Sequence, residues 1–122
     1  MSVSLGVVLD PLAHTRGVRA AILAAEDDGV PVQALAHEDV DADTLAALGC
    51  RLYRSARLAS GRAGFGASAV MHIEAQDGQI CVAPVQTSEG TLVLIVLTEA
   101  DANIGAVRMA LTRTARDAGS AT

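Results

Sequence analysis

Apolar residues recur along this chain with two different periods, and each change of period marks the border of a predicted element. Residues 2–13 carry apolar side chains at three- and four-residue intervals, which predicts a short amphipathic helix. Residues 18–25 and 30–36 are two compact apolar runs on either side of an Asp-Asp-Gly turn signal, so we expect them to form a β-hairpin. Pro31 lacks an N–H donor, and the second strand is therefore expected at an edge of its sheet.

The middle of the chain predicts a long helix, which begins at Asp41 or Asp43 as N-cap and runs to about Ser60. Its sheet-facing stripe is predicted from apolar residues at helical spacing, namely Leu45, Leu48, Leu52 and Ala56. Steps of 100° per residue place another set on or near the outer side, namely Ala47, Cys50, Arg54, Arg57 and Leu58. Small apolar residues mixed with arginine are typical of a protein contact surface, although an alanine-rich composition alone would also produce this pattern.

The last part of the chain predicts a meander and a final helix. Three apolar runs at residues 67–75, 79–85 and 91–98 are separated by tight-turn residues, and a helix is expected at 103–118. Residues 92–97 are apolar at every position, so both faces of that strand must be covered. Pro84 is expected at a bulge or near a strand end. The order α-β-β-α-β-β-β-α predicts an α+β type of α/β fold, a three-layer α/β/α sandwich around a five-stranded antiparallel sheet.

Composition narrows the classes of function. With 122 residues, 51% of them hydrophobic, residues 1–122 are expected to form one domain with an ordered core at about 3–118. All nine basic residues are arginine, and the lack of lysine excludes a Walker-type phosphate loop and Schiff-base chemistry. A net charge of −5 argues against nucleic-acid binding. No aliphatic run approaches the roughly 20 residues of a membrane span, so membrane insertion is not expected.

The reactive side chains do not form a recognisable active-site motif. Cys50 and Cys81 stand apart in the sequence and are expected to be free thiols in a cytoplasmic protein. His14, His37 and His72 fall in three different predicted elements without metal-ligand spacing. The glycines at 61, 64 and 66 follow a helix, whereas those of a dinucleotide-binding motif open one. We therefore expect no catalytic residue, no cofactor and no metal.

Five short motifs occur in the order and spacing of the roadblock/dynein light chain family. They are Arg16-Gly17-Val18-Arg19-Ala20-Ala21, the Asp28-Gly29 turn, Leu45-Ala46-Ala47-Leu48, the strand Gly78 to Val85 with Pro84, and the segment Asp101 to Arg108. They cover nearly the whole chain, which resembles the prokaryotic, MglB-like members of the family. Its members carry proline before the Gly-Val pair, where this chain has Arg16. The resemblance implies a profilin-like arrangement of the predicted sandwich.

The resemblance also implies a regulator or adaptor and not an enzyme. Prokaryotic members similar to this chain partner small Ras-like GTPases, and MglB-like proteins accelerate GTP hydrolysis by remodelling the GTPase. If the partner is such a GTPase, the expected contacts are Arg51, Tyr53, Arg54 and Arg57. Two alternatives stay open: a scaffold of a signalling or motility complex that touches no GTPase, and a sensor that binds a small ligand.

A homodimer is expected as well. The strand predicted at residues 67–75 has no lysine or proline to guard its edge. The resemblance implies that two such edges pair into one sheet, with the two central helices packed across the two-fold axis. The predicted dimer contacts are Ala47, Cys50, Leu58, Val70 and His72.

Overall fold

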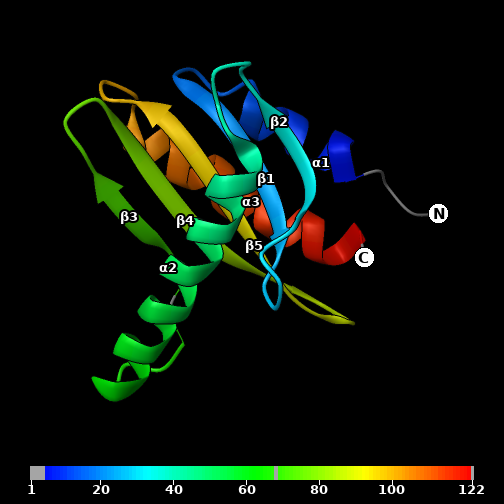
Figure 1. The fold of residues 1–122 in the computed structure, drawn as a ribbon, viewed down its shortest axis with the longest axis vertical. Helices are drawn as coiled ribbons and strands as arrows, with labels where there is room; N and C mark the ends of the chain where they lie inside the picture. The colour runs from blue at the N-terminus through cyan, green and yellow to red at the C-terminus, as the bar shows by residue number, and fades with distance from the viewer. Residues whose placement is uncertain (1–4, 68, 122) are drawn as a thin grey trace.

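The computed structural model describes residues 5–67 and 69–121, and its elements follow the predicted order (Figure 1). The helices are α1 (Leu5–Ala13), α2 (Ala42–Arg62) and α3 (Ile104–Ala121). The strands are β1 (Val18–Ala25), β2 (Pro31–Ala36), β3 (Met71–Glu74), β4 (Gly78–Thr87) and β5 (Gly90–Glu99). The predicted fold class, a mixed fold of five antiparallel strands and three helices, is confirmed.

The five strands form one antiparallel sheet in the order β2-β1-β5-β4-β3. β2 lies at one edge, as Pro31 predicted, and β3 lies at the other. β5 is the central strand, paired with β1 on one side and β4 on the other. Successive side chains of a strand point to opposite faces, so Leu94 enters one core and Ile95 the other. The uniformly apolar run at 92–97 is explained by this double burial.

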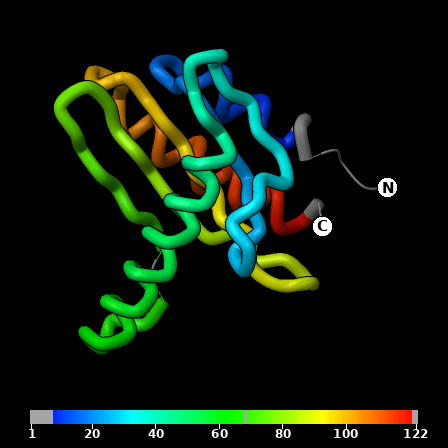
Figure 2. Tube along the Cα trace, viewed as in Figure 1, coloured from blue at the N-terminus to red at the C-terminus, as the bar shows by residue number. Residues whose placement is uncertain are grey.

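Helices cover both faces of the sheet, which gives the predicted three layers (Figure 2). α1 and α3 lie side by side on one face, where Leu9, Leu12 and Leu111 are fully buried. α2 crosses the opposite face and packs over Ile22 and Ile95 in a smaller core. The core is therefore divided by the sheet into a larger part under α1 and α3 and a smaller part under α2.

Two details of the strands differ from the sequence prediction. A strand was predicted over 67–75, of which residue 68 lies outside the described residues; among the others, Met71–Glu74 pair with β4 and form β3. Pro84 lies inside β4 opposite Val93, without a shift of register. The pairing of β3 reaches only Val82, so Pro84 lies where one side of β4 has no partner strand. A missing N–H donor is tolerated at such a position, and the expected bulge is not formed.

The β1–β2 turn lies directly against α2. Gly29 takes a φ of +71°, a conformation that favours glycine, and the N–H of Val30 donates to Asp28 Oδ1 at 3.0 Å. A Cβ added to Gly29 would lie 3.1 Å from the Cα of Ala47 in α2. The turn and its acidic residues are thereby fixed beside one flank of the helix.

Candidate functional site

Helix α2 is held to the sheet over its first half and projects beyond it at its C-terminal end (Figure 1). Asp41 is the N-cap: its carboxylate accepts hydrogen bonds from the backbone N–H and the hydroxyl of Thr44, at 3.2 and 2.7 Å. These hydrogen bonds hold the pKa of Asp41 below its usual value of 3.8. Residues 57–59 and 61–67 are all exposed. The C-terminal part of α2 thus offers a free surface, unlike a helix that packs along its whole length.

The predicted sheet-facing stripe of α2 is wrong in part: Leu45 packs against the core under the helix, but Leu48 does not. The side chains buried against the sheet are those of Ala46, Cys50 and Tyr53, with Gly49 between them, whereas Leu48 is 45% exposed. The reason is the close approach of the helix to β5. A Cβ added to Gly49 would stand 2.5 Å from side-chain carbons of Ile95, so a larger residue there would force Ile95 or the helix to shift. Small residues therefore occupy the point of closest approach to the sheet, and Leu48 lies on the flank of the helix.

The observed orientation of α2 also changes the position expected for two of the predicted contact residues. Cys50 is fully buried, its thiol donates to the backbone oxygen of Ala25 at 3.6 Å, and burial raises its pKa. Tyr53 is only 6% exposed and belongs to the same core. Cys50 does not face outward as predicted, and Tyr53 offers little area to a partner. Both residues hold α2 to the sheet.

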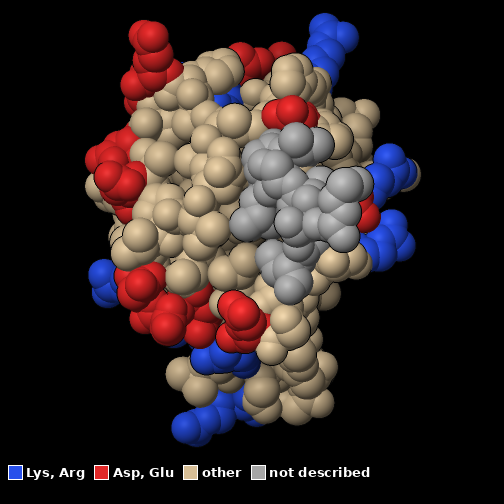
Figure 3. Space-filling view, turned by 90° about the vertical axis from the view of Figure 1, so that its right-hand side faces the viewer, with Lys and Arg blue, Asp and Glu red and all other residues tan. Residues whose placement is uncertain are grey.

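Two arginines of α2 bind the β1–β2 turn. Arg54 donates to the backbone oxygen of Glu26 at 2.7 Å, and Arg57 forms an ion pair with the Glu26 carboxylate at 3.5 Å. The guanidinium of Arg57 also lies over the Tyr53 ring, 5.5 Å from its centre. Figure 3 shows acidic residues gathered just above the basic residues of the projecting end. Arg54 and Arg57 are therefore fixed in place, while half of the Arg57 side chain stays exposed.

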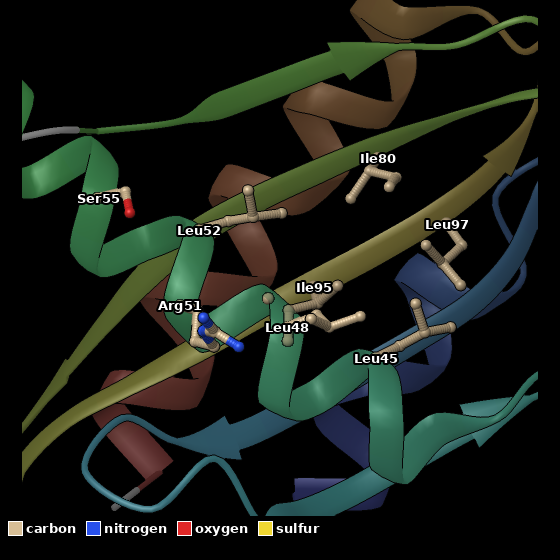
Figure 4. Close-up of a pocket in the computed structure, with 9 residues that line it drawn as sticks. Leu45, Leu48, Arg51, Leu52, Ser55, Ile80, Ile95 and Leu97 are labelled. Carbon is tan, nitrogen blue, oxygen red and sulfur yellow. The ribbon is translucent and has the colours of Figure 1, made fainter.

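An apolar groove of about 390 Å³ lies between α2 and the central strands (Figure 4). Its lining is mainly aliphatic: Leu45, Leu48, Leu52, Ile80, Ile95 and Leu97. Arg51 and Ser55 supply the polar groups of the lining. We call this feature the α2–β4 groove. The leucines that were predicted to be buried under α2 thus form one wall of an open recess, and the exposed Arg51 lies at that wall.

The predicted dimer contacts lie on both faces of the sheet. Ala47 and Leu58 are exposed on α2, whereas Val70 packs against the core under α1 and α3. His72 stands opposite Cys81 on that same face, and its Nε2 is hydrogen-bonded to Gln79 Oε1 at 2.7 Å. Four of the five residues remain candidates, because only Cys50 is removed by burial. The edge strand β3 borders both faces of the sheet, so a partner at this edge could reach contacts on either face.

The described residues show neither a candidate metal site nor a candidate membrane-spanning helix. Among residues 5–67 and 69–121, no three His, Cys, Asp or Glu side chains lie close enough together to hold a metal ion. No helix in the described part of the chain combines the length and hydropathy that a membrane span requires.

Besides the pKa values of Asp41 and Cys50, two others are shifted. Hydrogen bonding to Arg19 lowers the pKa of Asp39, and burial raises the pKa of Cys81.

Several solved structures share this arrangement over nearly the whole chain. A tetrameric arrangement of MglB superposes with a TM-score of 0.84 and 17% identity, covering 96% of this chain and 86% of that chain. The gliding protein MglB of Thermus thermophilus gives a TM-score of 0.83 at 16% identity, covering 96% and 87%. A roadblock/LC7 domain of Streptomyces avermitilis gives 0.79 at 20% identity, covering 93% of each chain. No protein-family model matches the sequence, and no curated protein matches it significantly.

These comparisons define the class of fold. The chain has the roadblock fold, with the same succession of helices and strands on one sheet. Within that class it is similar to the MglB proteins, which confirms for the fold the resemblance found in the sequence.

Proposed function

We propose that this chain is a non-enzymatic, homodimeric regulator or adaptor of a small Ras-like GTPase. The observation that carries the proposal is the likeness to MglB structures over nearly the full length of both chains. A GTPase is proposed as the partner because the sequence resembles prokaryotic family members that partner small Ras-like GTPases. One of the similar structures is named a gliding protein, which favours a role in motility. Another is an MglB with a tetrameric arrangement, which supports association of this chain with itself.

The arginines of α2 are the proposed GTPase contacts. Arg51 is exposed, and Arg57 offers half of its side chain, so both can pair with carboxylates of a switch region. Arg54 donates to the backbone of the β1–β2 turn and so fixes this turn beside Arg57. Tyr53, which was predicted as a direct contact, orients Arg57 from below. The proposed direct contacts are thus Arg51 and Arg57, and the contacts of Arg57 with Glu26 and the Tyr53 ring order its side chain before a partner binds.

The fixed position of Arg57 favours an indirect effect on GTP hydrolysis. An inserted arginine must extend into the active site of the GTPase, where it can raise the rate by roughly 10³- to 10⁵-fold. Arg57 is instead held by Glu26 and by the Tyr53 ring. Release from both contacts would offset part of the gain from insertion. The resemblance to MglB-like proteins implies that such contacts instead bind the GTPase and reorder its own catalytic residues.

Substitution of the arginines tests the proposal. Arg54→Ala and Arg57→Ala should each lower the affinity for the GTP-bound partner by roughly 1 to 3 kcal/mol and leave the hydrolysis rate at saturation unchanged. The probe is a small Ras-like GTPase from the same organism, loaded with a non-hydrolysable GTP analogue and titrated by calorimetry. Arg113→Ala on the exposed surface of α3 is the matched control. A double variant that binds as tightly as the wild type would remove α2 from the site.

A further inference from the structure

The outer edge of β2 is a strand edge without a charged side chain. β2 has β1 on one side and no neighbour on the other within the described sheet. The sequence from Val30 to Ala36 reads Val-Pro-Val-Gln-Ala-Leu-Ala, so neither an acidic nor a basic residue lies on the strand. Charged side chains and proline are the usual means by which an open edge avoids pairing with another chain, and here Pro31 alone has that effect.

The backbone of β2 directs some of its hydrogen-bonding groups away from the sheet. The N–H of His37 donates to the oxygen of Arg19 at 3.1 Å, so the backbone groups of residue 37 face β1. The register with β1 is regular from residue 33 to residue 36, and the direction of the backbone groups alternates along an antiparallel strand. The N–H and C=O groups of Ala34 and Ala36 therefore point outward, where a further strand can pair with them.

The side chains along this edge are apolar and partly exposed. Val30 and Val32 are 55% and 47% exposed. Leu35 is half-buried against the core under α1 and α3, and Ala34 packs against the core under α2. Figure 3 faces the side of the molecule on which β2 lies in Figure 1, and it shows a broad uncharged area there. A strand placed beside β2 would extend both faces of the sheet and cover apolar side chains.

Acidic residues stand at both ends of β2. Asp27 and Asp28 precede the strand and Glu38 follows it, and all three are exposed. The neighbouring Glu26 and Asp39 are already paired with arginines, whereas Asp27 and Glu38 form no ion pair within residues 5–67 and 69–121. A segment with lysine or arginine near its ends would therefore meet an opposite charge at each end of the strand.

The same charges disfavour a second copy of this chain as the occupant. If two β2 strands paired in antiparallel fashion, Asp27 and Asp28 of each copy would lie beside Glu38 of the other. In a parallel pair, the two Asp27-Asp28 turns would lie side by side. Both arrangements bring like charges together in a chain with a net charge of −5. The charge distribution thus favours a basic segment of another protein.

We propose that β2 binds an extended, basic segment of another protein as a sixth strand of the sheet. The segment pairs with the backbone groups of Ala34 and Ala36, lays apolar side chains beside Val32, and places basic side chains near Asp27 and Glu38. β2 and β3 lie at opposite edges of the sheet, so this inference does not depend on the homodimer expected at β3.

Defined peptides test the chemistry of the occupant. The probe is a fluorescein-labelled peptide of alternating valine and threonine with an arginine at each end, titrated by fluorescence anisotropy. One control peptide has glutamate at each end, and the other keeps the arginines but has glycine and serine between them. We expect the arginine-ended valine peptide to bind at least about 10-fold more tightly than either control. Equal binding of the glycine–serine peptide would show a purely electrostatic contact and overturn the addition of a strand.

Substitutions in the protein locate the site. Asp27→Lys and Glu38→Lys reverse exposed charges at the two ends of β2 and should each weaken binding of the arginine-ended valine peptide by about 3- to 10-fold. Asp77→Lys, in the turn between β3 and β4 at the opposite edge, is the matched control and should leave binding unchanged. Unchanged binding in the first two variants would overturn the inference, and so would an equal loss in all three.

Ala34→Pro tests the role of the backbone. It removes an N–H that points away from β1, a position at which an edge strand tolerates proline, so circular dichroism should show a folded protein that no longer binds the peptide. Retained binding by folded Ala34→Pro would contradict strand addition. Self-association of the wild type that Ala34→Pro abolishes would show that a second copy occupies the edge instead. If Ala34→Pro does not fold, the charge variants and the control peptides decide the question.

Discussion

Alanine at Leu94 or at Ile95 should destabilise the protein by about 2 to 5 kcal/mol in each case. The two side chains are almost fully buried, and they enter the cores on opposite faces of the central strand β5. Each substitution removes buried methyl groups and leaves a cavity that the neighbouring helix cannot fill. Urea unfolding followed by circular dichroism measures both effects.

Val32→Ala provides the comparison for this pair. Val32 lies on the edge strand β2 and is 47% exposed, so its truncation should change stability by no more than about 0.5 kcal/mol. An Ile95→Ala variant as stable as the Val32→Ala variant would contradict the packing of α2 on β5. The Leu94 variant tests the core under α1 and α3 in the same way.

Gly49→Ala and Gly61→Ala, the same substitution at two positions of α2, should change stability in opposite directions. At Gly61 nothing lies within 4 Å of an added Cβ, so alanine should stabilise the helix by about 0.5 to 1 kcal/mol. At Gly49 the added Cβ would stand 2.5 Å from side-chain carbons of Ile95. Forcing α2 away from β5 should cost about 1 to 3 kcal/mol despite the gain in helix propensity. Thermal and urea unfolding measure both variants.

Relief of the collision distinguishes this cause from a local effect on the helix. Ile95→Val removes one of the carbons that the new methyl group meets, so the loss caused by Gly49→Ala should be smaller in the Ile95→Val background. Additive effects of the two substitutions, or a stabilising Gly49→Ala, would show that Gly49 does not set the distance between α2 and the sheet.

The orientation of α2 shows where sequence reasoning fails. Periodicity placed the helix correctly in the chain, because Asp41 caps it and the glycines that follow it end it. The same periodicity misplaced the centre of the buried stripe, since it assumes that the largest apolar side chains are buried, and Leu48 is exposed. Close packing against β5 instead requires small residues such as Ala46 and Gly49. The spacing Ala46, Gly49, Cys50 and Tyr53 is itself helical, and it could have been recognised as a stripe of close approach.

The contacts of the arginines could not be predicted from the sequence. Helical spacing placed Arg54 and Arg57 on the outer side of the helix, and in the structure both contact Glu26. Glu26 lies 28 residues before Arg54 in the chain, in a turn whose position depends on the register of β1 and β2. Only the assembled fold brings that turn to the helix. The hairpin itself was predictable, because Asp28 and Gly29 supply the turn locally.

Association of two copies of this chain is the central claim of the proposed function. Sedimentation equilibrium of the wild-type chain at tens of micromolar tests it most directly. We expect a species of twice the chain mass of 12.4 kDa, which dissociates on dilution. A single species of 12.4 kDa over the whole concentration range would contradict the homodimer.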